Sequence, residues 1–445
     1  MVERATWKSR LGFILASVGS AVGLGNIWRF PFQTAENGGA AFLLVYLIAV
    51  VVIGLPAILA EFVIGRRSQR NAIDAFGRLG FPRWRIVGAL GVFTGFWVMS
   101  YYSVIGGWVV RYTLGSATGA YLGSPATYFE TIASGLPAVA FHGLFMAVAV
   151  GIVAFGVAAG IERATTLMVP AIVVLLLGIA VYAATLPGAS AGYAYFLSPD
   201  VDAIVANAAS VVPAAVGQAL FSLSLGFSVM ITYASYVGED DNLGIDGLSI
   251  AGFNTGVGLL AGFVVFPLLF AQGVSPETAG PGAIFVSIPT ALADVPGSRA
   301  VGAVFFFVVL IAALSSAISL LEVLVSYVVD NFGYDRARVA VAAGLVIFLL
   351  GLPSAMDLAW LGWFDGVAVN LFLPLVVTLV VVFVGWVMAG DAVAELRAGS
   401  RGSASIARAW LWTLRTVVLV AVVLTLALGV LELAGPENAY VLPPI

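Results

Sequence analysis

The stretch from Ser17 to Pro31, SVGSAVGLGNIWRFP, lies in an apolar run but contains residues that a membrane-spanning helix normally lacks. It has three glycines, an asparagine, an arginine and a proline. Non-helical backbone is tolerated at membrane depth only where protein buries it or where it lines a cavity. An arginine inside a membrane segment is itself a functional hypothesis. The first apolar segment therefore predicts part of a binding site as well as a membrane span.

The composition places the whole chain in a membrane. Of the 445 residues, 61% are hydrophobic and 9% are charged, and the mean hydropathy is +1.08. A soluble domain has about 25% charged residues, so this chain has too few charges to cover a surface that faces water. It has no cysteine, which excludes disulfide bonds, thiol chemistry and thiolate metal sites.

The apolar runs predict an all-α polytopic membrane protein. About 20 apolar residues cross a bilayer as one helix, and eleven segments of the chain satisfy that rule. They lie near 11–35, 40–65, 87–113, 138–157, 164–186, 207–236, 246–272, 295–330, 336–352, 362–389 and 409–433.

The basic residues predict the orientation of these spans. They precede the first span and occupy the loops between spans 2 and 3, 4 and 5, 8 and 9, and 10 and 11. Because arginine and lysine mark cytoplasmic loops, we expect the N-terminus inside the cell and the C-terminus outside. The acidic loop 238–247 falls on the cytoplasmic side and is expected to be solvated.

A second apolar span, 207–236, is also interrupted near its centre. Ser222, Ser224, Gly226 and Ser228 stand there. Each interrupted span is the first of five consecutive spans. Paired interruptions at corresponding positions of two halves point to a transporter built on inverted repeats. The alternative is that small residues merely pack these helices closely. The expected divisions are a cytoplasmic segment 1–10, a first repeat 11–186, an extracellular loop 187–206, a second repeat 207–389, and 390–445 with the eleventh span and an extracellular tail.

The two breaks predict the chemistry of a ligand. Unwinding a helix frees backbone amides, which attract a carboxylate, and carbonyls, which attract a cation. Uncharged oxygens of asparagine, serine and backbone carbonyls suit a hard cation. A small zwitterion beside a sodium ion fits these groups.

Three segments are long enough to be specific: GSAVGLGNIWRFPFQTAENGGAAF, AVGQALFSLSLGFSVMITYASYV and AALSSAISL. Together with Tyr101 and Tyr102 they resemble the neurotransmitter:sodium symporter family, in its bacterial and archaeal amino-acid transporter branch. The resemblance implies the leucine-transporter fold, a 5+5 inverted repeat with helices 1 and 6 broken and eleven transmembrane helices. It also implies sodium-coupled import of neutral hydrophobic L-amino acids by alternating access across a prokaryotic plasma membrane.

The same resemblance implies a set of site residues. The substrate carboxylate would meet the amides near Leu24 and Gly25 and the hydroxyl of Tyr102. The whole substrate site would comprise Ala21, Gly23, Leu24, Gly25, Val98, Tyr102, Phe221, Ser222, Ser224, Phe227, Ser316, Ser319 and Leu320. Two sodium ions are the only metals implied. The first would lie at Ala21, Asn26, Ser222 and Asn254, and the second at Gly19, Val22, Ala312, Ser315 and Ser316.

The resemblance also implies gates and supporting groups. The outer gate would be Arg29 with Asp365, although Asp357 lies in the same segment, and the inner gate would be Arg4 with Asp330, assisted by Trp7. Glu61 would hydrogen-bond the unwound backbone of the second broken span. The Gly160–Pro170 spacing would let span 5 unwind at its cytoplasmic end. Glu322 is also intramembrane, and the sequence suggests no partner for it.

Chloride dependence stays open at the level of sequence. Relatives that need chloride carry a serine four residues after the asparagine at position 254, where this chain has Gly258. Tyr46, Gln218 and Ser222 otherwise resemble the chloride site. The expected partners are the lipid bilayer and a hydrophobic amino acid, with no nucleic acid and no obligate protein partner.

Other function classes fit the sequence less well. A sodium-coupled transporter of another small amine or osmolyte is the nearest alternative. An ion channel needs rings of carbonyls or charges in an oligomer, and none is evident. An intramembrane enzyme lacks residues for its chemistry, because the chain has no cysteine, His142 is the only histidine and H-E-x-x-H does not occur.

Overall fold

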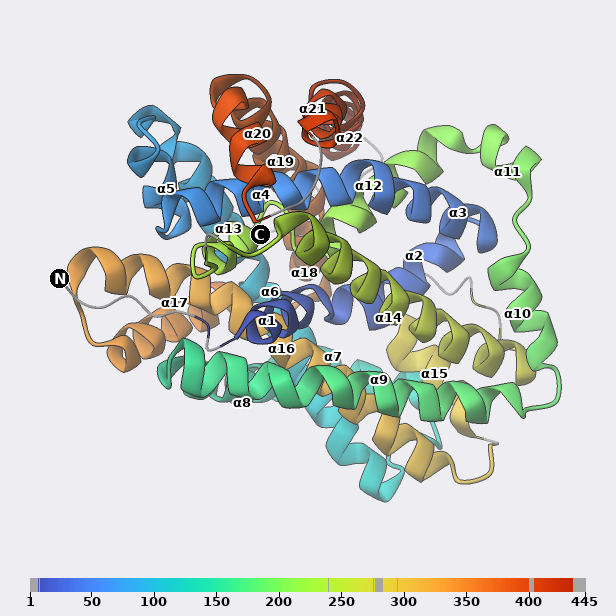
Figure 1. Ribbon diagram of the computed structural model, residues 1–445. Helices are drawn as coiled ribbons and strands as arrows, with labels where there is room; N and C mark the ends of the chain where they lie inside the picture. Colours follow the sequence, from blue (N-terminus) through green and yellow to red (C-terminus); the bar gives the residue numbers. More distant parts are fainter. Residues whose placement is uncertain are drawn as a thin grey trace.

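The computed structural model describes residues 7, 9–238, 240–274, 276, 283–293, 295–399 and 404–434. Throughout these ranges every regular element is a helix (Figure 1), which confirms the expected all-α class. Arg4, expected in the inner gate, and the expected extracellular tail 435–445 lie outside the described residues.

The helices of the first half follow the expected spans 1 to 5 in order. They are α1 (Arg10–Ala21), η1 (Gly25–Arg29), α2 (Phe30–Glu36), α3 (Ala40–Ala49), η2 (Val50–Gly54), α4 (Leu55–Ser68), α5 (Ala72–Arg78), η3 (Pro82–Trp84), α6 (Arg85–Thr118), α7 (Pro125–Ala133), α8 (Gly135–Ala154), η4 (Val157–Ile161) and α9 (Glu162–Ala184). The expected loop 187–206 holds α10 (Ala189–Leu197) and α11 (Val201–Ala206).

The second half repeats this pattern and adds one more span. Its helices are α12 (Ala208–Ser222), α13 (Val229–Ala234), α14 (Leu243–Ala271), α15 (Ala283–Ala293), α16 (Ser298–Phe332), α17 (Arg336–Met356), α18 (Leu358–Val367), η5 (Ala368–Phe372), α19 (Leu373–Val382), η6 (Phe383–Val387), α20 (Ala389–Arg397), α21 (Ala404–Thr413), η7 (Leu414–Val418) and α22 (Leu419–Ala434).

The expected count of eleven spans holds approximately. Within the described ranges, nine continuous helices are long and apolar enough to cross a membrane. A tenth is the pair Arg10–Ala21 and Gly25–Glu36, which is bent by 47° at its break. The remaining expected span is α12 with α13, and its break leaves α12 only 15 residues long. The sixth span is therefore too short to pass as one straight helix.

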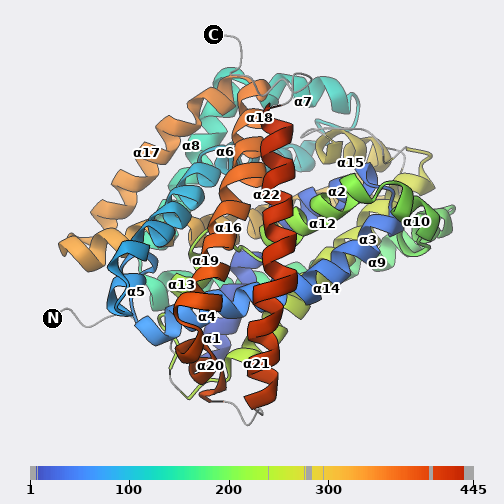
Figure 2. The same cartoon turned by 90° about the horizontal axis from the view of Figure 1, so that it is seen from above.

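Burial separates the helices of the core from those that face lipid. α1 lies in the middle of the bundle and contacts α9, α13, α14 and α16 (Figure 1). In α16, 83% of the most apolar 18-residue stretch is buried, against 17% in the span formed by α21 and α22. That span lies at the edge of the bundle in Figure 1 and passes in front of the other helices in Figure 2. The two broken spans and α16 thus form the interior, where polar groups can be shielded from lipid.

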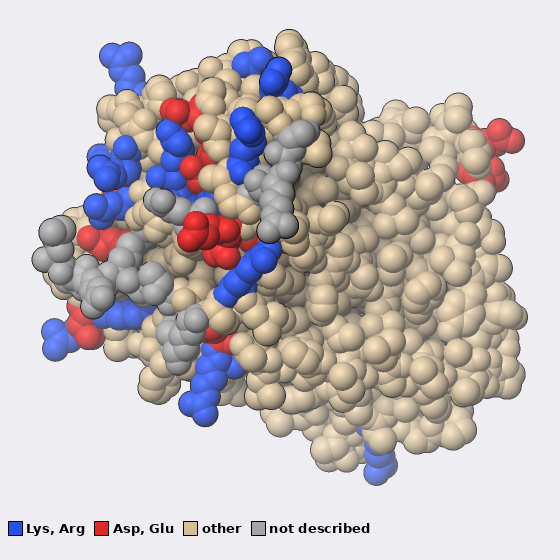
Figure 3. All heavy atoms as spheres, viewed as in Figure 1, with Lys and Arg blue, Asp and Glu red and all other residues tan. Residues whose placement is uncertain are grey.

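The charged side chains gather at one end of the molecule. Figure 3 shows most of the visible Lys and Arg toward the left of the view, over the region of α5, α20 and the start of α17. The opposite part of that face carries few charges. An uneven distribution of basic residues between the two ends is typical of membrane proteins.

Candidate functional site

The first break opens the backbone between α1 and α2. α1 ends at Ala21, Val22 is extended with φ −79° and ψ 98°, and helical structure resumes as a π-type turn at Gly25. The break is closely surrounded, since a Cβ added at Gly23 would lie 2.0 Å from the Oγ of Ser316. Glycine is therefore required at this point by the close approach of α16.

The second break replaces the middle of the sixth span with a strained loop. Ser224, Gly226 and Ser228 have φ values of 54°, 80° and 60°, which are uncommon for residues other than glycine. Such conformations persist where the surroundings hold them, and they cluster at functional sites. Here the carboxylate of Glu61 on α4 accepts a hydrogen bond of 2.9 Å from the backbone N–H of Gly226. The expected role of Glu61 is confirmed.

The two breaks meet and share hydrogen bonds. The backbone carbonyl of Ser20 accepts hydrogen bonds from the hydroxyl groups of Ser224 at 3.0 Å and Ser316 at 2.8 Å. The side-chain amide of Gln218 donates to the carbonyl of Gly25 at 2.8 Å. Side chains of α12, α16 and the second break therefore satisfy some of the carbonyls that unwinding has freed.

A small cavity lies at the junction of the breaks. Its volume is about 20 Å³, which is room for about one water molecule. The rings of Phe221 and Phe227 meet there edge to face, with centroids 5.9 Å apart, so the break does bring these two side chains together. The cavity is lined by Ser20, Ala21, Gly25, Val98, Tyr102, Phe221, Ser224, Phe227, Ser316 and Leu320.

The lining differs from the substrate site expected from sequence at five positions: Gly23, Leu24, Ser222 and Ser319 are expected but do not line the cavity, and Ser20 lines it without being expected. Ser319 is not among the lining residues; its hydroxyl accepts from the hydroxyl of Tyr233 at 2.9 Å and donates to the carbonyl of Ser315 at 3.2 Å. Ser20 does line the cavity, and sequence reasoning missed it. Its position directly before Ala21, the last residue of α1, was the available signal.

One end of the cavity carries the groups expected to bind a carboxylate. The freed N–H of Leu24 donates to the hydroxyl oxygen of Tyr102 at 3.2 Å. Both residues are buried, so the amide and the hydroxyl are screened from bulk water. A carboxylate placed there would accept hydrogen bonds from both groups, and charge-assisted bonds of this kind are stronger than neutral ones.

The residues expected to hold the first sodium place their oxygens together. The amide of Asn254 has two possible orientations, because its oxygen and nitrogen are alike in shape. In one orientation the oxygen accepts a hydrogen bond from Nδ2 of Asn26 at 2.9 Å. The same oxygen then lies 3.1 Å from the Ala21 carbonyl, 3.0 Å from the Ser222 carbonyl and 3.3 Å from Oδ1 of Asn26.

This oxygen cluster fits a cation. Oxygens that accept but do not donate repel one another unless a positive group lies among them. In the other orientation the nitrogen of Asn254 takes that place and donates to the same oxygens. A hard cation such as sodium would favour the first orientation, since the donor set is then made of oxygen alone.

The residues expected to hold the second sodium include an unpaired hydroxyl. The Oγ of Ser315 is buried and has no hydrogen-bond partner within the described ranges. It points at the backbone of α1, because a Cβ added at Gly19 would lie 2.5 Å from it. A buried polar atom without a partner costs about 1–3 kcal/mol, and a cation would use this oxygen. Val22 and Ala312, whose carbonyls are expected to contribute, are fully buried.

An outer cavity of about 800 Å³ lies above the breaks and is lined by η1, α2, α12, α18, η5 and α22. The expected gate residues Arg29 and Asp365 both line it. Arg29 donates to Gln218 Oε1 at 2.8 Å and lies over the ring of Phe221 at 5.1 Å. Asp365 accepts from the hydroxyl of Tyr101 at 2.8 Å. No ion pair joins the two gate residues in the part of the chain that the structure describes, so the expected outer gate is not formed in this conformation.

The last helix also contributes to the outer cavity, which sequence reasoning missed. Thr425, Leu428, Gly429 and Glu432 of α22 line it. The spacing of these residues places them on one helix face, and this pattern was the available signal.

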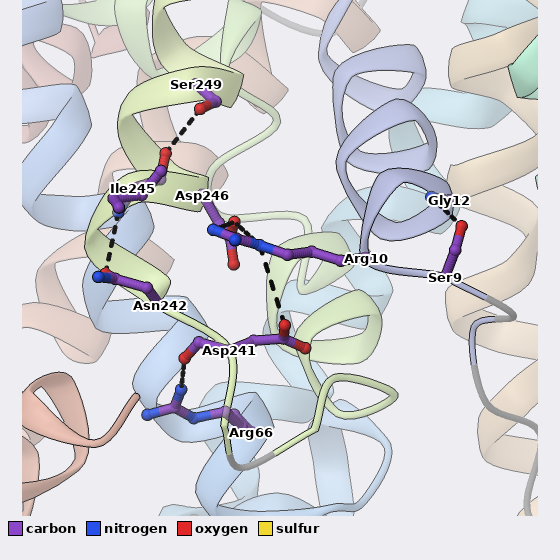
Figure 4. A network of polar contacts seen from close by, with 9 residues as sticks. All are labelled: Ser9, Arg10, Gly12, Arg66, Asp241, Asn242, Ile245, Asp246 and Ser249. Atoms are coloured by element: carbon purple, nitrogen blue, oxygen red, sulfur yellow. Dashed lines mark hydrogen bonds and ion pairs between the residues drawn. The ribbon is translucent and has the colours of Figure 1, made fainter. Parts of the chain in front are cut away.

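The opposite end of α1 is closed by aromatic and charged contacts. Trp7 donates through Nε1 to the carbonyl of Tyr233 at 3.1 Å, and its ring packs edge-on against Tyr233 and Tyr236. Arg10 binds Oδ1 of Asp246 with Nη2 at 2.6 Å and with Nε at 2.9 Å (Figure 4). These contacts hold the first residues of α1 against α13 and α14.

The acidic loop before α14 is therefore not simply solvated. The side chain of Asp246 is 0% exposed, and Asp241 approaches Arg10 at 3.9 Å. The backbone carbonyl of Asp241 accepts from Arg66 of α4 at 2.5 Å (Figure 4). The expectation of a solvated loop holds for Asp240, which is exposed, but not for Asp246, which is buried against Arg10, an arginine distant in sequence.

Two further acidic groups acquire partners near this end. Glu322 is fully buried on α16; it is ion-paired with Arg336, and the hydroxyl of Tyr236 donates to it at 3.4 Å. Asp330, expected in the inner gate, accepts from Asn71 at 3.4 Å.

The groups that resemble a chloride site lie beside the oxygen cluster. The hydroxyl groups of Tyr46 and Ser222 are 3.1 Å apart, and Gln218 is used by Arg29 and by the carbonyl of Gly25. A Cβ at Gly258 would lie 3.6 Å from the Asn26 amide nitrogen, so this position faces the cluster without adding a hydroxyl or a charge.

Comparisons with known proteins agree with this geometry. The sequence model of the Sodium:neurotransmitter symporter family matches residues 4–123 and 135–445. The chain is 35% identical over 437 residues to the sodium-dependent transporter YhdH of Bacillus subtilis, covering 94% of this chain and 96% of that protein. It is 37% identical over 418 residues to the sodium-dependent transporter MJ1319 of Methanocaldococcus jannaschii, covering 88% of this chain and 84% of that protein. The crystal structure of MhsT in complex with L-phenylalanine superposes with a TM-score of 0.88 at 40% identity, covering 96% of this chain and 100% of MhsT.

Proposed function

Because the chain belongs to the sodium:neurotransmitter symporter family, we propose that it imports neutral hydrophobic L-amino acids together with sodium. The membership makes it a multi-pass, sodium-dependent membrane transporter and not an enzyme. The observation that carries the finer proposal is the cavity between the two breaks, which has polar groups at one end and apolar walls elsewhere.

The proposed substrate binds with its carboxylate at the N–H of Leu24 and the hydroxyl of Tyr102. Its side chain lies among Val98, Phe227 and Leu320, which are apolar. The cavity of about 20 Å³ is smaller than any amino acid, so the walls move on binding. The ring of Phe221 separates this cavity from Arg29 above it, and its rotation opens the path. MhsT binds L-phenylalanine, which also combines a carboxylate with an apolar side chain.

Two sodium ions are proposed to couple the gradient to this substrate. The first binds at the oxygens of Ala21, Asn26, Ser222 and Asn254, next to the substrate carboxylate. The second binds at Ser315 with Ser316 and the carbonyls of 19, 22 and 312, and links α1 to α16. Because each cation lies at a junction between helices, its binding favours the conformation in which those helices are in contact.

The cycle is proposed to begin from the conformation described above. Rotation of the Phe221 ring then connects the outer cavity to the substrate site, while Trp7 and Arg10 close the opposite end. Closure of Arg29 onto Asp365 and release of the start of α1 then expose the site to the other side. The arginine-rich end is proposed to face the cytoplasm of a prokaryotic cell, with the C-terminus outside.

The substrate class is tested by competition against a bound hydrophobic amino acid. We expect leucine, phenylalanine and tryptophan all to compete, because an apolar pocket discriminates weakly among apolar side chains, with one methylene changing binding by about 1–3 kcal/mol. Lysine and glutamate would bury an unpaired charge and should compete at least tenfold more weakly than all three. Scintillation-proximity binding in sodium measures this order. Competition by glutamate or by a carboxylate-free amine as strong as that by leucine refutes the proposed class.

The contact between Arg10 and Asp246 is predicted to hold the inner side closed. Arg10→Ala leaves a buried carboxylate without its cation, which costs about 1–3 kcal/mol. Asp246→Asn leaves an arginine whose side chain is 42% exposed and can be solvated. Both variants should favour the inward-open state, and Arg10→Ala should do so more strongly.

The inner closure is measured by labelling a single cysteine. The natural chain has none, and Ser17→Cys places one on α1 at a buried position. We expect labelling by a water-soluble maleimide to be about 5–150-fold faster with Arg10→Ala, and unchanged with Arg408→Gln, an exposed arginine of α21. Equal labelling rates in all variants would show that the pair does not close the inner side.

A further inference from the structure

A groove of about 470 Å³ lies between α6, α16 and α17, separate from both cavities on the substrate path. Its apolar walls include Phe96 of α6, Leu324 and Val328 of α16, and Val346 of α17. The groove exists because α17 has the small residue pair Ala342 and Ala343 where larger side chains would fill the space.

The neighbouring surface of α17 faces the acyl chains of the bilayer. Val341, Leu345 and Leu349 are exposed and apolar, and α17 is one of the helices that are long and apolar enough to span a membrane. The groove therefore opens toward lipid rather than toward water, and an apolar chain is the natural occupant of its walls.

One end of the groove is polar. Tyr334, Asp335 and Arg338 line it at the start of α17. The carboxylate of Asp335 accepts from the backbone N–H of Arg338 at 3.1 Å and caps the helix. In the described ranges the guanidinium of Arg338 and the hydroxyl of Tyr334 have no hydrogen bond or ion pair. The ring of Tyr334 stacks on Phe332 at 6.0 Å, and both rings are exposed, as is typical of aromatics at a membrane interface.

The dimensions match one leaflet of a bilayer. Arg338 and Val346 are eight positions apart on α17, which corresponds to about 12 Å along the helix axis. One leaflet of the hydrocarbon core is about 15 Å thick. The groove thus has a polar end at the interface, where Arg338 is the only basic side chain in the described lining and Asp335 is held as a helix cap, and an apolar length that covers most of a leaflet.

We propose that this groove binds an anionic phospholipid from the leaflet at the arginine-rich end of the molecule. Its phosphate interacts with Arg338 and the hydroxyl of Tyr334, and one acyl chain lies along Ala342 and Ala343. The lipid packs against Phe96 of α6 and Leu324 of α16, the helices that carry Tyr102 and Ser316, and so supports the wall of the substrate site. The proposal depends on membrane insertion and is independent of which substrate is carried.

The test is retention of defined lipids by the full-length purified protein, measured by native mass spectrometry. The protein is equilibrated with detergent micelles that contain phosphatidylglycerol or phosphatidylcholine of the same acyl chains. We expect the unmodified protein to retain phosphatidylglycerol preferentially. Arg338→Gln should reduce that preference roughly fivefold, the effect of one arginine at a membrane surface, and the control Arg408→Gln should not.

A second variant tests the proposed contact between the acyl chain and the groove, separately from the headgroup. Ala342 is exposed, so Ala342→Phe fills the groove without disturbing the core, and it should reduce retention of both lipids. Leu345→Phe, also exposed on α17 but outside the groove, is the matched control and should not. Retention that is equal in Ala342→Phe and Leu345→Phe, or a headgroup preference unaffected by Arg338→Gln, overturns the proposal.

Discussion

Replacing Asn26 with alanine is expected to raise the sodium concentration at which substrate binds by about 5–150-fold, which corresponds to a coupling of about 1–3 kcal/mol. The side-chain oxygen of Asn26 belongs to the cluster with Asn254 and the carbonyls of Ala21 and Ser222. Asn26→Ala removes one ligand of the proposed first sodium and leaves the broken backbone and the apolar walls in place. Substrate binding titrated against sodium by isothermal calorimetry measures the shift.

The linkage also works in the opposite direction. If sodium tightens substrate binding by a given factor, substrate must tighten sodium binding by the same factor, and Asn26→Ala should reduce both equally. The competing explanation is that Asn26 only stabilises the break. Asp335→Ala is the control for that explanation, because Asp335 caps α17 and its loss lowers stability by about 1 kcal/mol without changing sodium dependence. An unshifted sodium midpoint in folded Asn26→Ala protein refutes the ligand role.

Removing the hydroxyl of Tyr102 is expected to weaken the binding of hydrophobic amino acids by about 10–150-fold. A hydrogen bond to a charged group contributes about 1.5–3 kcal/mol, and this hydroxyl lies beside the freed amide of Leu24. Tyr102→Phe keeps the ring and its packing. The matched control is Tyr101→Phe, because the neighbouring hydroxyl is also buried but binds Asp365; it should change affinity by less than about fivefold.

The ligand can be varied together with the protein. The methyl ester of leucine has no carboxylate, so it should bind the unmodified protein and Tyr102→Phe with similar, weak affinity. The difference between the two ligands then isolates the contact between hydroxyl and carboxylate, as in a double-mutant cycle. An equal loss of affinity for leucine and its ester assigns Tyr102 to packing and contradicts the proposed carboxylate site.

The helix breaks were predictable because the residues that cause them are incompatible with a lipid-facing helix. Gly23, Gly25 and Asn26 in the first break, and Ser224 and Gly226 in the second, stand out in apolar sequence without any knowledge of the fold. The position of Glu61 beside the second break came from family resemblance, and the structure places its carboxylate on the amide of Gly226.

The closing contacts at the arginine-rich end were not predictable in the same way. Arg10 and Asp246 are 236 residues apart, and each lies among other charges of the same sign in the sequence. Their pairing depends on the packing of α1 against α14. The partner of Glu322 lies only 14 residues away, but it approaches across the turn between α16 and α17, which no local periodicity reveals.

Side-chain direction also limited the sequence analysis. Ser319 was expected in the substrate pocket, but its hydroxyl binds Tyr233 and the carbonyl of Ser315. A hydroxyl can be satisfied by any nearby backbone carbonyl, so its helical position does not determine which cavity it faces. The contribution of α22 to the outer cavity was missed for a similar reason, since a helix that faces lipid on most sides can still have one face toward solvent.

Uptake driven by an ion gradient tests the central claim most directly. Purified protein in liposomes is given radiolabelled L-phenylalanine with either sodium or potassium outside, at equal ionic strength. We predict that the amino acid accumulates above its external concentration only with an inward sodium gradient, and that it leaves again when an ionophore collapses the gradient. The same uptake in potassium, or equilibration without accumulation in sodium, contradicts sodium-coupled symport of this substrate.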